Sequence, residues 1–188
     1  LVGKDVHEHK RLMKQLSVVT GYWSLQGAAQ HAISAIDIAL FDCRSKLEGS
    51  PLFKFLGGEN RPIKLYASGG DAIDPAAMED EMAAVQELGI DLLKIRARNN
   101  QVEKAVWCQK RGAAIGIGIA VDMTQNLAIP SQTVEEAQRF VDTLKTKSGE
   151  GPVFLEEAMG PEAIEGFNEL RKRLKGITKV AGGEIVTT

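Results

Sequence analysis

The fold is decided by the stretch "GIDLLKIRARNN", residues 89–100, which stands between two segments with helical patterns. Its short apolar run is typical of a buried strand, in which successive side chains point to opposite faces. Lys94 and Arg96 would therefore lie side by side on one face of this strand. Two like charges at the end of a buried strand repel each other, so we expect negatively charged groups opposite them.

Strand and helix patterns alternate on both sides of this stretch, from residue 63 onward. The preceding helix has Asp74 as its N-cap, Pro75 at its first position and Gly89 at its end. A later helix begins at the capping box formed by Thr133 and Glu136. The chain therefore predicts four helices, beginning near 75, 101, 133 and 161, and five strands, at 63–68, 91–97, 115–123, 152–158 and 178–184.

This alternation predicts an α/β protein with a parallel sheet. Because crossovers between parallel strands are right-handed, two architectures remain, an open doubly wound sheet and a TIM barrel. A dinucleotide-binding sheet is disfavoured, since no glycine-rich loop follows the first strand. Gly116 and Gly118 fall inside the third expected strand, which is the wrong place for a phosphate loop.

Residues 1–62 have a different character, because they show helical patterns and no strand pattern. The clearest helix carries apolar residues spaced at three and four and stops at Gly49 and Pro51. The stretch "LGGENRP", residues 56–62, reads as a linker. We therefore expect two domains, residues 1–62 and 63–188. The apolar face of the first would consist of Ala29, Ile33, Ile36, Leu40, Cys43 and Leu47.

The composition is that of an ordinary globular protein, with 188 residues and a formal net charge of −2. Such a charge favours neither nucleic acid nor an anionic membrane as a partner. No signal peptide is visible, and the apolar runs are too short to span a bilayer. Cys43 and Cys108 lack the spacing of a zinc site or a disulfide framework, so we expect a reducing, cytoplasmic setting. We also expect the chain to be part of a longer protein.

Acidic residues end three consecutive strands of the expected sheet. Asp122 ends the third strand, Glu156 and Glu157 the fourth, and Glu184 the fifth. In parallel α/β folds the carboxyl ends of the strands form the ligand face. One acid after a strand is more often a helix cap or a solvated loop residue, but three in a row favour a site. Their shared charge requires a counter-ion, and a hard divalent cation such as Mg²⁺ fits oxygen ligands.

Four motifs in order make the sequence similar to a known family. "KIR", "VDMTQN", "FLEEAMGPEAIEGF" and "VAGGE" begin at residues 94, 121, 154 and 180. Together they resemble the enolase superfamily, specifically its mandelate racemase and muconate lactonizing enzyme branch. The upstream stretch "AISAIDIALFDCRSKLEGSPLFKFLGG" is similar to the end of that branch's capping domain.

The resemblance implies a partial TIM-type (β/α)7β barrel preceded by the helical end of an α+β capping domain. Residues 1–62 would belong to the capping domain, and 63–188 would form the first half of the barrel. The family's three Mg²⁺ ligands correspond to Asp122, Glu156 and Glu184. Its shared step removes the proton α to a substrate carboxylate through an enediolate. In its K-x-K pattern the first residue, here Lys94, contacts the substrate carboxylate and the second is commonly the base.

Two departures from the family bear on the reaction. Arg96 stands where the basic lysine is common, and arginine stays protonated, so it is a poor general base. A two-base racemase is therefore disfavoured, and dehydration of an acid sugar is preferred. Thr124 stands where the family often has asparagine, on the same face as Asp122. This exchange would alter the surroundings of the metal.

Other functions remain as alternatives. A racemase or epimerase of the same superfamily would need a second base in a part of the protein beyond this chain, and a cycloisomerase of that superfamily is a further alternative. A Schiff-base aldolase with Lys94 as nucleophile would leave the three acids unexplained. A further alternative is a metal-binding half-barrel without activity. Because an incomplete barrel exposes sheet edges, we expect self-association, and members of the family are often homo-oligomers.

Overall fold

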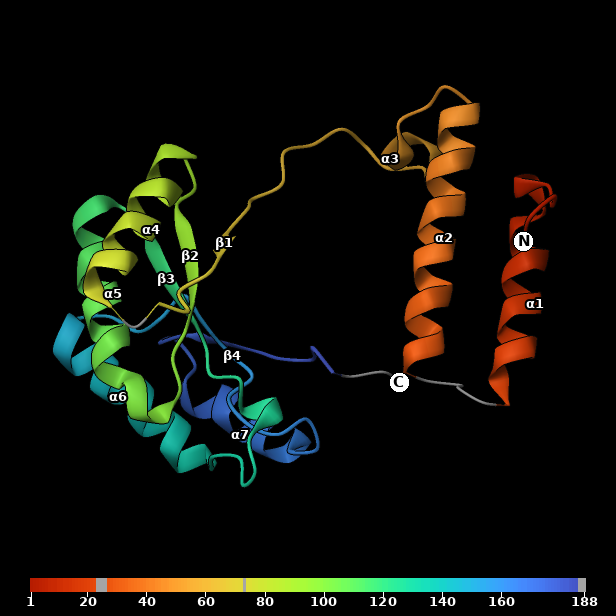
Figure 1. Ribbon diagram of the computed structural model, residues 1–188. Helices are drawn as coiled ribbons and strands as arrows, with labels where there is room; N and C mark the ends of the chain where they lie inside the picture. The colour runs from red at the N-terminus through yellow and green to blue at the C-terminus, as the bar shows by residue number, and fades with distance from the viewer. Residues whose placement is uncertain (23–26, 73, 186–188) are drawn as a thin grey trace. The chain divides into compact units, whose positions relative to one another are not determined.

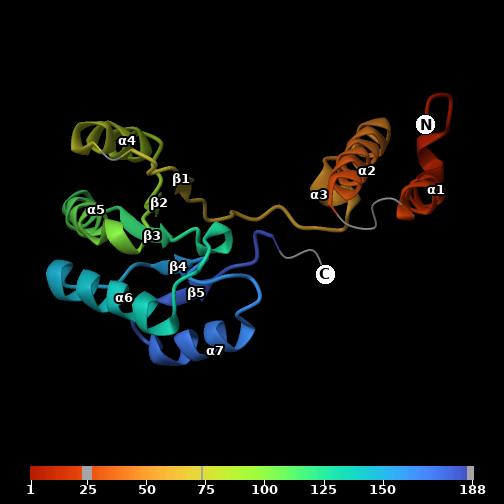
Figure 2. The same ribbon diagram turned by 60° about the horizontal axis from the view of Figure 1, so that its bottom comes forward.

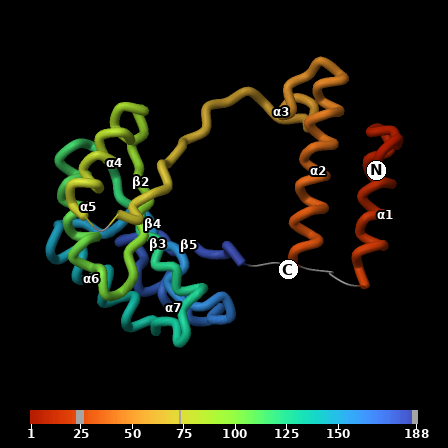
Figure 3. The backbone as a smooth tube through the Cα atoms, in the orientation of Figure 1, coloured from red at the N-terminus to blue at the C-terminus, as the bar shows by residue number. Residues whose placement is uncertain are grey.

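The computed structural model describes residues 1–22, 27–72 and 74–185. The chain divides into two compact units, and the trace in Figure 3 allows each to be followed. The first covers Leu1–Ile63, and the second starts at Lys64 and is described as far as Ile185. Within the described residues, no helix is both long enough and apolar enough to pass through a membrane.

The first unit is helical, as predicted. Its helices are α1 (His9–Gly21), α2 (Ala28–Leu47) and the short α3 (Leu52–Phe55), with α1 and α2 side by side in Figures 1 and 3. The buried His9 joins α1 to α2: its Nε2 lies 2.5 Å from Oδ1 of Asp37, and its ring packs edge-on against Phe41. Along the expected apolar face Ile33 is buried, whereas Leu47 is exposed. The unit therefore covers only part of that face by itself.

The second unit contains a parallel sheet of five strands in the order β1-β2-β3-β4-β5. Its helices α4, α5, α6 and α7 all lie on one side of the sheet (Figures 1 and 2). A sequential strand order has no point at which the order reverses, and a doubly wound sheet requires one. The arrangement therefore matches the predicted partial barrel. In chain order, the strands β1 to β5 are Ala67–Ser68, Leu92–Arg96, Gly118–Asp122, Phe154–Glu156 and Lys179–Ala181. The helices α4 to α7 are Pro75–Glu87, Val102–Ile115, Val134–Ser148 and Ile164–Arg173.

The core lies between the sheet and these helices. Leu93 and Ile95 of β2 are fully buried, and they belong to one cluster with Met82 of α4 and with residues of the other helices. Burying such apolar side chains is the main favourable contribution to folding. The alternate residues of β2 face the other side of the sheet, so Lys94 and Arg96 share one face, as predicted.

The two helix caps read from the sequence are confirmed, whereas the last helix begins at Ile164 instead of near residue 161. The side chain of Asp74 accepts a hydrogen bond from the backbone N–H of Ala77 at the start of α4. Thr133 and Glu136 form the complete capping box at the start of α6, each side chain bonded to the other residue's backbone. These contacts satisfy backbone donors that the first turn of a helix leaves unpaired.

All five strands are shorter than predicted, and the boundaries that differ most are the start of β1, the start of β3 and the end of β5. β3 begins at Gly118 instead of residue 115, because Ile115 ends α5 and Gly116 caps that helix in the left-handed conformation (φ 79°). β1 contains only Ala67–Ser68. Ala67 pairs with Leu93, and β2 begins only one residue earlier, at Leu92, so the residues before Ala67 have almost no strand to pair with. β5 ends at Ala181, three residues before Glu184, so Glu184 lies in the loop after the strand.

Candidate active site

The register of the sheet aligns three of its charged residues at the carboxyl ends of the strands. Arg96 of β2 is paired with Asp122 of β3, and Asp122 with Glu156 of β4. Residues that pair directly in neighbouring strands present their side chains on the same face. Lys94, two residues before Arg96, also lies on this face. The two strand-end acids and the two cations predicted from the sequence thus occupy one rim.

Lys94 is the cation that contacts both acids. Its Nζ donates to the two carboxylate oxygens of Glu156, each at 3.0 Å, and lies 3.8 Å from Oδ2 of Asp122. The same nitrogen lies 5.7 Å from the ring centre of Tyr66, within the range of a cation–π contact. The side chain of Lys94 is 13% exposed and that of Asp122 only 4%, so water screens this cluster weakly.

The burial of the cluster changes its proton affinities. Burial raises the pKa of Asp122 above its usual range and the nearby charge of Glu156 raises it further, which outweighs the hydrogen bond from the Thr124 N–H. For Lys94, burial alone would lower the pKa, but the hydrogen bonds and charge of Glu156 raise it above its ordinary value. The ammonium is therefore firmly protonated, and the two acids share one positive charge.

Arg96 has a different partner from Lys94. Its Nη1 lies 3.3 Å from both carboxylate oxygens of Asp71, which sits in the loop after β1. Gly70 fixes that loop: its N–H donates to Glu81, and a Cβ at this position would lie 2.5 Å from Cβ of Ile95. The position therefore requires glycine, which also adopts its φ of +72° without strain. The negative partner of Arg96 thus comes from the first strand's loop, outside the set of acids that the sequence suggested.

Thr124 links the carboxylate of Asp122 to Arg98. Its backbone N–H donates to Oδ1 of Asp122 at 2.8 Å, and its Oγ1 accepts from Nε of Arg98 at 2.9 Å. Thr124 holds a left-handed conformation (φ 49°), which is strained for a β-branched residue. The sequence flagged Thr124 as a departure, and the structure shows that its hydroxyl engages a cation from the loop after β2.

Glu184 stands apart from the other two predicted metal ligands. It is exposed in the loop after β5, where its Oε2 accepts from Nδ2 of Asn126 at 3.3 Å. Across the described ranges, no group of three His, Cys, Asp or Glu side chains is arranged to hold a metal ion. The structure therefore brings together Lys94, Asp122 and Glu156, and it leaves the third acid at the end of the adjoining loop.

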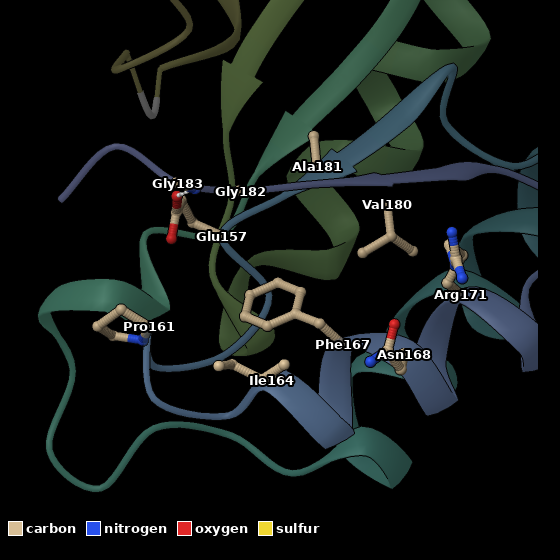
Figure 4. A pocket seen from close by; sticks show the side chains of 10 residues that line it. All are labelled: Glu157, Pro161, Ile164, Phe167, Asn168, Arg171, Val180, Ala181, Gly182 and Gly183. Carbon is tan, nitrogen blue, oxygen red and sulfur yellow. Dashed lines mark hydrogen bonds between the residues drawn. The ribbon is translucent and has the colours of Figure 1, made fainter. Parts of the chain in front are cut away.

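Glu157 has a structural role beside the site. Its side chain is buried, and its Oε1 accepts hydrogen bonds from the backbone N–H groups of Gly183 and Glu184. These bonds hold the loop that carries Glu184. Figure 4 shows the carboxylate beside Gly183, at the edge of a cavity of about 320 Å³ whose walls include Ile164, Phe167 and Val180. The acid pair Glu156 and Glu157 at the end of β4 was visible in the sequence, but the loop that Glu157 bonds to was not.

Comparisons with known proteins find similarity over nearly the whole chain. Residues 1–57 match the family model of the mandelate racemase/muconate lactonizing enzyme N-terminal domain. The chain is 28% identical over 189 residues to the D-gluconate dehydratase of Thermoproteus tenax, covering 97% of this chain and 38% of that protein. It is 28% identical over 141 residues to the D-mannonate dehydratase of Xanthomonas oryzae pv. oryzicola, covering 75% of this chain and 32% of that protein.

A solved structure shares the fold of this chain. An enolase from Bradyrhizobium complexed with magnesium and mandelic acid has 26% sequence identity and a TM-score of 0.75, covering 98% of this chain and 49% of that one. The chain thus spans about half the length of this structure and less than half of the two curated relatives. These matches support the resemblance: residues 1–57 match the N-terminal domain model of the mandelate racemase/muconate lactonizing enzyme family, and the chain has the fold of this enolase.

Proposed function

We propose that this chain forms part of a Mg²⁺-dependent enzyme that removes the proton α to the carboxylate of an acid sugar and completes a dehydration through an enediolate. The observation that carries the proposal is the pairing of Asp122 with Glu156 at the carboxyl ends of adjacent strands, with Lys94 beside both. The names of two relatives, a D-gluconate and a D-mannonate dehydratase, support dehydration.

The residues present fit a magnesium ion in their donor chemistry. Asp122 and Glu156 offer hard carboxylate oxygens in register, and one lysine balances the two negative charges only in part. Glu184 would join them from the loop after β5 as the third ligand. When bound there, Mg²⁺ supplies positive charge that stabilises the enediolate and makes the α proton more acidic. The magnesium and mandelic acid in the Bradyrhizobium relative support this choice of ligand.

Lys94 and Arg96 have separate roles in this proposal. Lys94 would bind the substrate carboxylate, since its protonated ammonium lies at the rim beside the two acids. Arg96 would orient and neutralise the substrate instead of removing the proton, because a guanidinium paired with Asp71 stays charged. The base would then be another group, which one-base dehydration allows, because a single group can act first as base and later as acid.

The same contacts weigh against two alternatives. A racemase or epimerase needs a base on each side of the α carbon, and Arg96 does not supply one. A Schiff-base aldolase needs a lysine with a lowered pKa, whereas the pKa of Lys94 is raised. A third alternative, a metal-binding half-barrel without activity, remains open because the chain spans half of its structural relative or less.

We also propose how the chain fits into the whole protein. Residues 1–62 would be the helical end of the capping domain, and residues 63–188 would be the first half of the barrel. The partner would be a small carboxylate in the cytoplasm, with no nucleic acid or membrane involved. The protein would form a homo-oligomer, which light scattering of the purified chain would detect.

The test is exchange of the α proton with solvent deuterium. The chain is incubated with Mg²⁺ and a panel of acid sugars in D₂O, and deuterium incorporation and 2-keto products are followed by NMR. The proposal expects incorporation that EDTA and Glu156→Gln both abolish. Magnesium binding without exchange or product for any acid sugar would favour the inactive half-barrel, and activity that persists in EDTA would contradict the proposal.

A further inference from the structure

A second polar pocket adjoins the proposed active site. It has a volume of about 410 Å³, and its walls come from the loops after β1, β2, β3 and β5 and from the start of α5. We call it the cation pocket, because three cations line it. It borders the site through Thr124, whose N–H holds Asp122, and through the proposed metal ligand Glu184. Its lining residues are Asp71, Arg96, Arg98, Asn100, Gln101, Lys104, Thr124, Leu127 and Glu184.

The guanidinium of Arg98 lines this pocket, and the structure shows one hydrogen bond that it donates. Its Nε donates to Oγ1 of Thr124, and its backbone N–H donates to Oε1 of Gln101 at 2.9 Å. Among the residues that the structure describes, none bonds to the two terminal nitrogens of Arg98. A guanidinium held at Nε presents these two nitrogens as a rigid fork, which matches the two oxygens of a carboxylate.

Lys104 and Gln101 add further donors beside Arg98. The ammonium of Lys104 donates to the backbone carbonyl of Gly70, and an ammonium carries three N–H groups. Since Oε1 of Gln101 accepts from Arg98, its amide nitrogen is left as a donor. Within the described part of the chain, neither Arg98 nor Lys104 forms an ion pair with a carboxylate. The pocket thus combines an amide donor with two cations that form no ion pair with any described residue.

The charges of the pocket leave room for one anion. Arg96 is paired with Asp71, so these two charges offset each other. Glu184 would share its charge with the metal under the proposed function. What remains is the positive charge of Arg98 and Lys104, which the hydroxyl of Thr124 and the carbonyl of Gly70 do not neutralise. Two cations confined to one pocket repel each other, and an anion between them relieves that repulsion.

We infer that the cation pocket binds a second carboxylate of the substrate, so that the preferred substrates are dicarboxylic acid sugars. This inference rests on the proposed function, because Lys94 then binds the carboxylate next to the reacting carbon. Arg98 and Lys104 would bind the carboxylate at the far end of the same molecule. A monocarboxylic acid sugar has a hydroxyl at that end, which carries no charge and offers one oxygen, whereas a carboxylate offers two oxygens that match the fork of a guanidinium.

The test compares matched pairs of acid sugars by calorimetry in the presence of Mg²⁺. Galactarate is titrated against galactonate, and glucarate against gluconate, into the wild type and into Arg98→Gln and Lys104→Gln. The wild type is expected to bind at least one dicarboxylate at least tenfold more tightly than its monocarboxylic counterpart. Each variant should reduce that ratio to below threefold while the affinity for the monocarboxylate changes by less than twofold. Because Arg98 also contacts Thr124, thermal unfolding of both variants accompanies the titrations.

The outcomes separate the inference from the proposed function. Binding of Mg²⁺ and of monocarboxylates without any preference for the dicarboxylates would overturn the inference and leave the proposed function standing. A preference that both variants retain would also overturn it. A further titration uses inorganic phosphate alone. If phosphate binds, Arg98→Gln abolishes that binding and the wild type shows no preference for dicarboxylates, the pocket is a phosphate site. That result would overturn the assignment of the pocket to a second carboxylate. If Mg²⁺ and all the acid sugars fail to bind, both the inference and the proposed function are wrong.

Discussion

Nζ of Lys94 in β2 lies 3.0 Å from both carboxylate oxygens of Glu156 in β4. Arg96 lies on the same face of β2 as Lys94. Oδ2 of Asp122 lies 3.8 Å from the same nitrogen, so one ammonium serves two carboxylates. This relationship makes Lys94 the counter-charge of the acids as well as the proposed carboxylate-binding residue. A divalent cation that binds Asp122 and Glu156 must therefore share them with Lys94.

Removing Lys94 should strengthen metal binding while it weakens substrate binding. In Lys94→Met the two acids lose the positive charge beside them, and Mg²⁺ should then bind at least about tenfold more tightly. Calorimetry with Mg²⁺ alone measures this effect. Lys147→Met is the matched control, since Lys147 pairs with Glu103 on the surface. An unchanged or weaker affinity in Lys94→Met would show that Lys94 does not compete for these acids.

Asp122 should reduce the stability of the metal-free protein at neutral pH. Because its pKa is raised in the folded state, folding favours the protonated form. That contribution to stability is fully present below the unfolded-state pKa, and it is lost as the pH rises through the folded-state pKa. Asp122→Asn cannot ionise and keeps an acceptor for the Thr124 N–H, so it should be more stable than the wild type at pH 7, by about 1 kcal/mol.

Urea unfolding in EDTA at pH 7 and at pH 4 measures this difference. The difference in the free energy of unfolding between Asp122→Asn and the wild type should be smaller at pH 4, because the wild-type carboxyl begins to hold its proton there. Addition of Mg²⁺ should stabilise the wild type and leave the variant unchanged. A variant that is less stable than the wild type at pH 7 would show that Asp122 contributes to folding.

The loop that carries Asp71 should depend on glycine at position 70. Gly70→Ala places a Cβ 2.5 Å from Cβ of Ile95 and forces alanine into a φ of +72°, so we expect a loss of about 2 kcal/mol or more. Gly89→Ala is a matched control, because Gly89 has a φ of +68° but no atom within 4 Å of an added Cβ. Chemical unfolding should show the larger loss for Gly70→Ala; equal losses would mean that the close approach to β2 is unimportant.

Cys108 should make stability fall in alkaline solution. Burial raises the pKa of its thiol to about 12. The stability from keeping this thiol protonated is fully present below its ordinary pKa of 9.0 and declines as the pH rises from there toward 12. The slope reaches at most about 1.4 kcal/mol per pH unit. Between pH 9 and 10 in reducing buffer, Cys108→Ala should lose less stability than the wild type; parallel pH profiles would contradict this cause.

Local signals in the sequence predicted most of the architecture. The capping box of Thr133 and Glu136 and the cap at Asp74 act within one turn, so they could be read without tertiary information. The buried pattern of "DLLKIRA" predicted β2 and the shared face of Lys94 and Arg96. By contrast, the length of β1 depends on where β2 begins, and that register is a tertiary property.

The contacts of the site were less predictable for the same reason. The sequence placed Asp122 and Glu156 at strand ends, and the pairing of β3 with β4 aligned them. It contained no local sign that Arg96 would pair with Asp71, or that Glu157 would hold the loop of Glu184, because these partners come from distant segments. Gly116 was misread as a strand residue because isoleucines flank it, although it caps α5.

The most direct measurement is a calorimetric titration of Mg²⁺ into the wild type, Asp122→Asn, Glu156→Gln and Glu184→Gln, with Glu165→Gln on the exposed face of α7 as the matched control. If the three acids form the metal site, the wild type and Glu165→Gln bind Mg²⁺ alike. Each of the other three substitutions then weakens binding by at least tenfold. Equal binding by all five proteins, or no binding by the wild type, would contradict the proposed metal site.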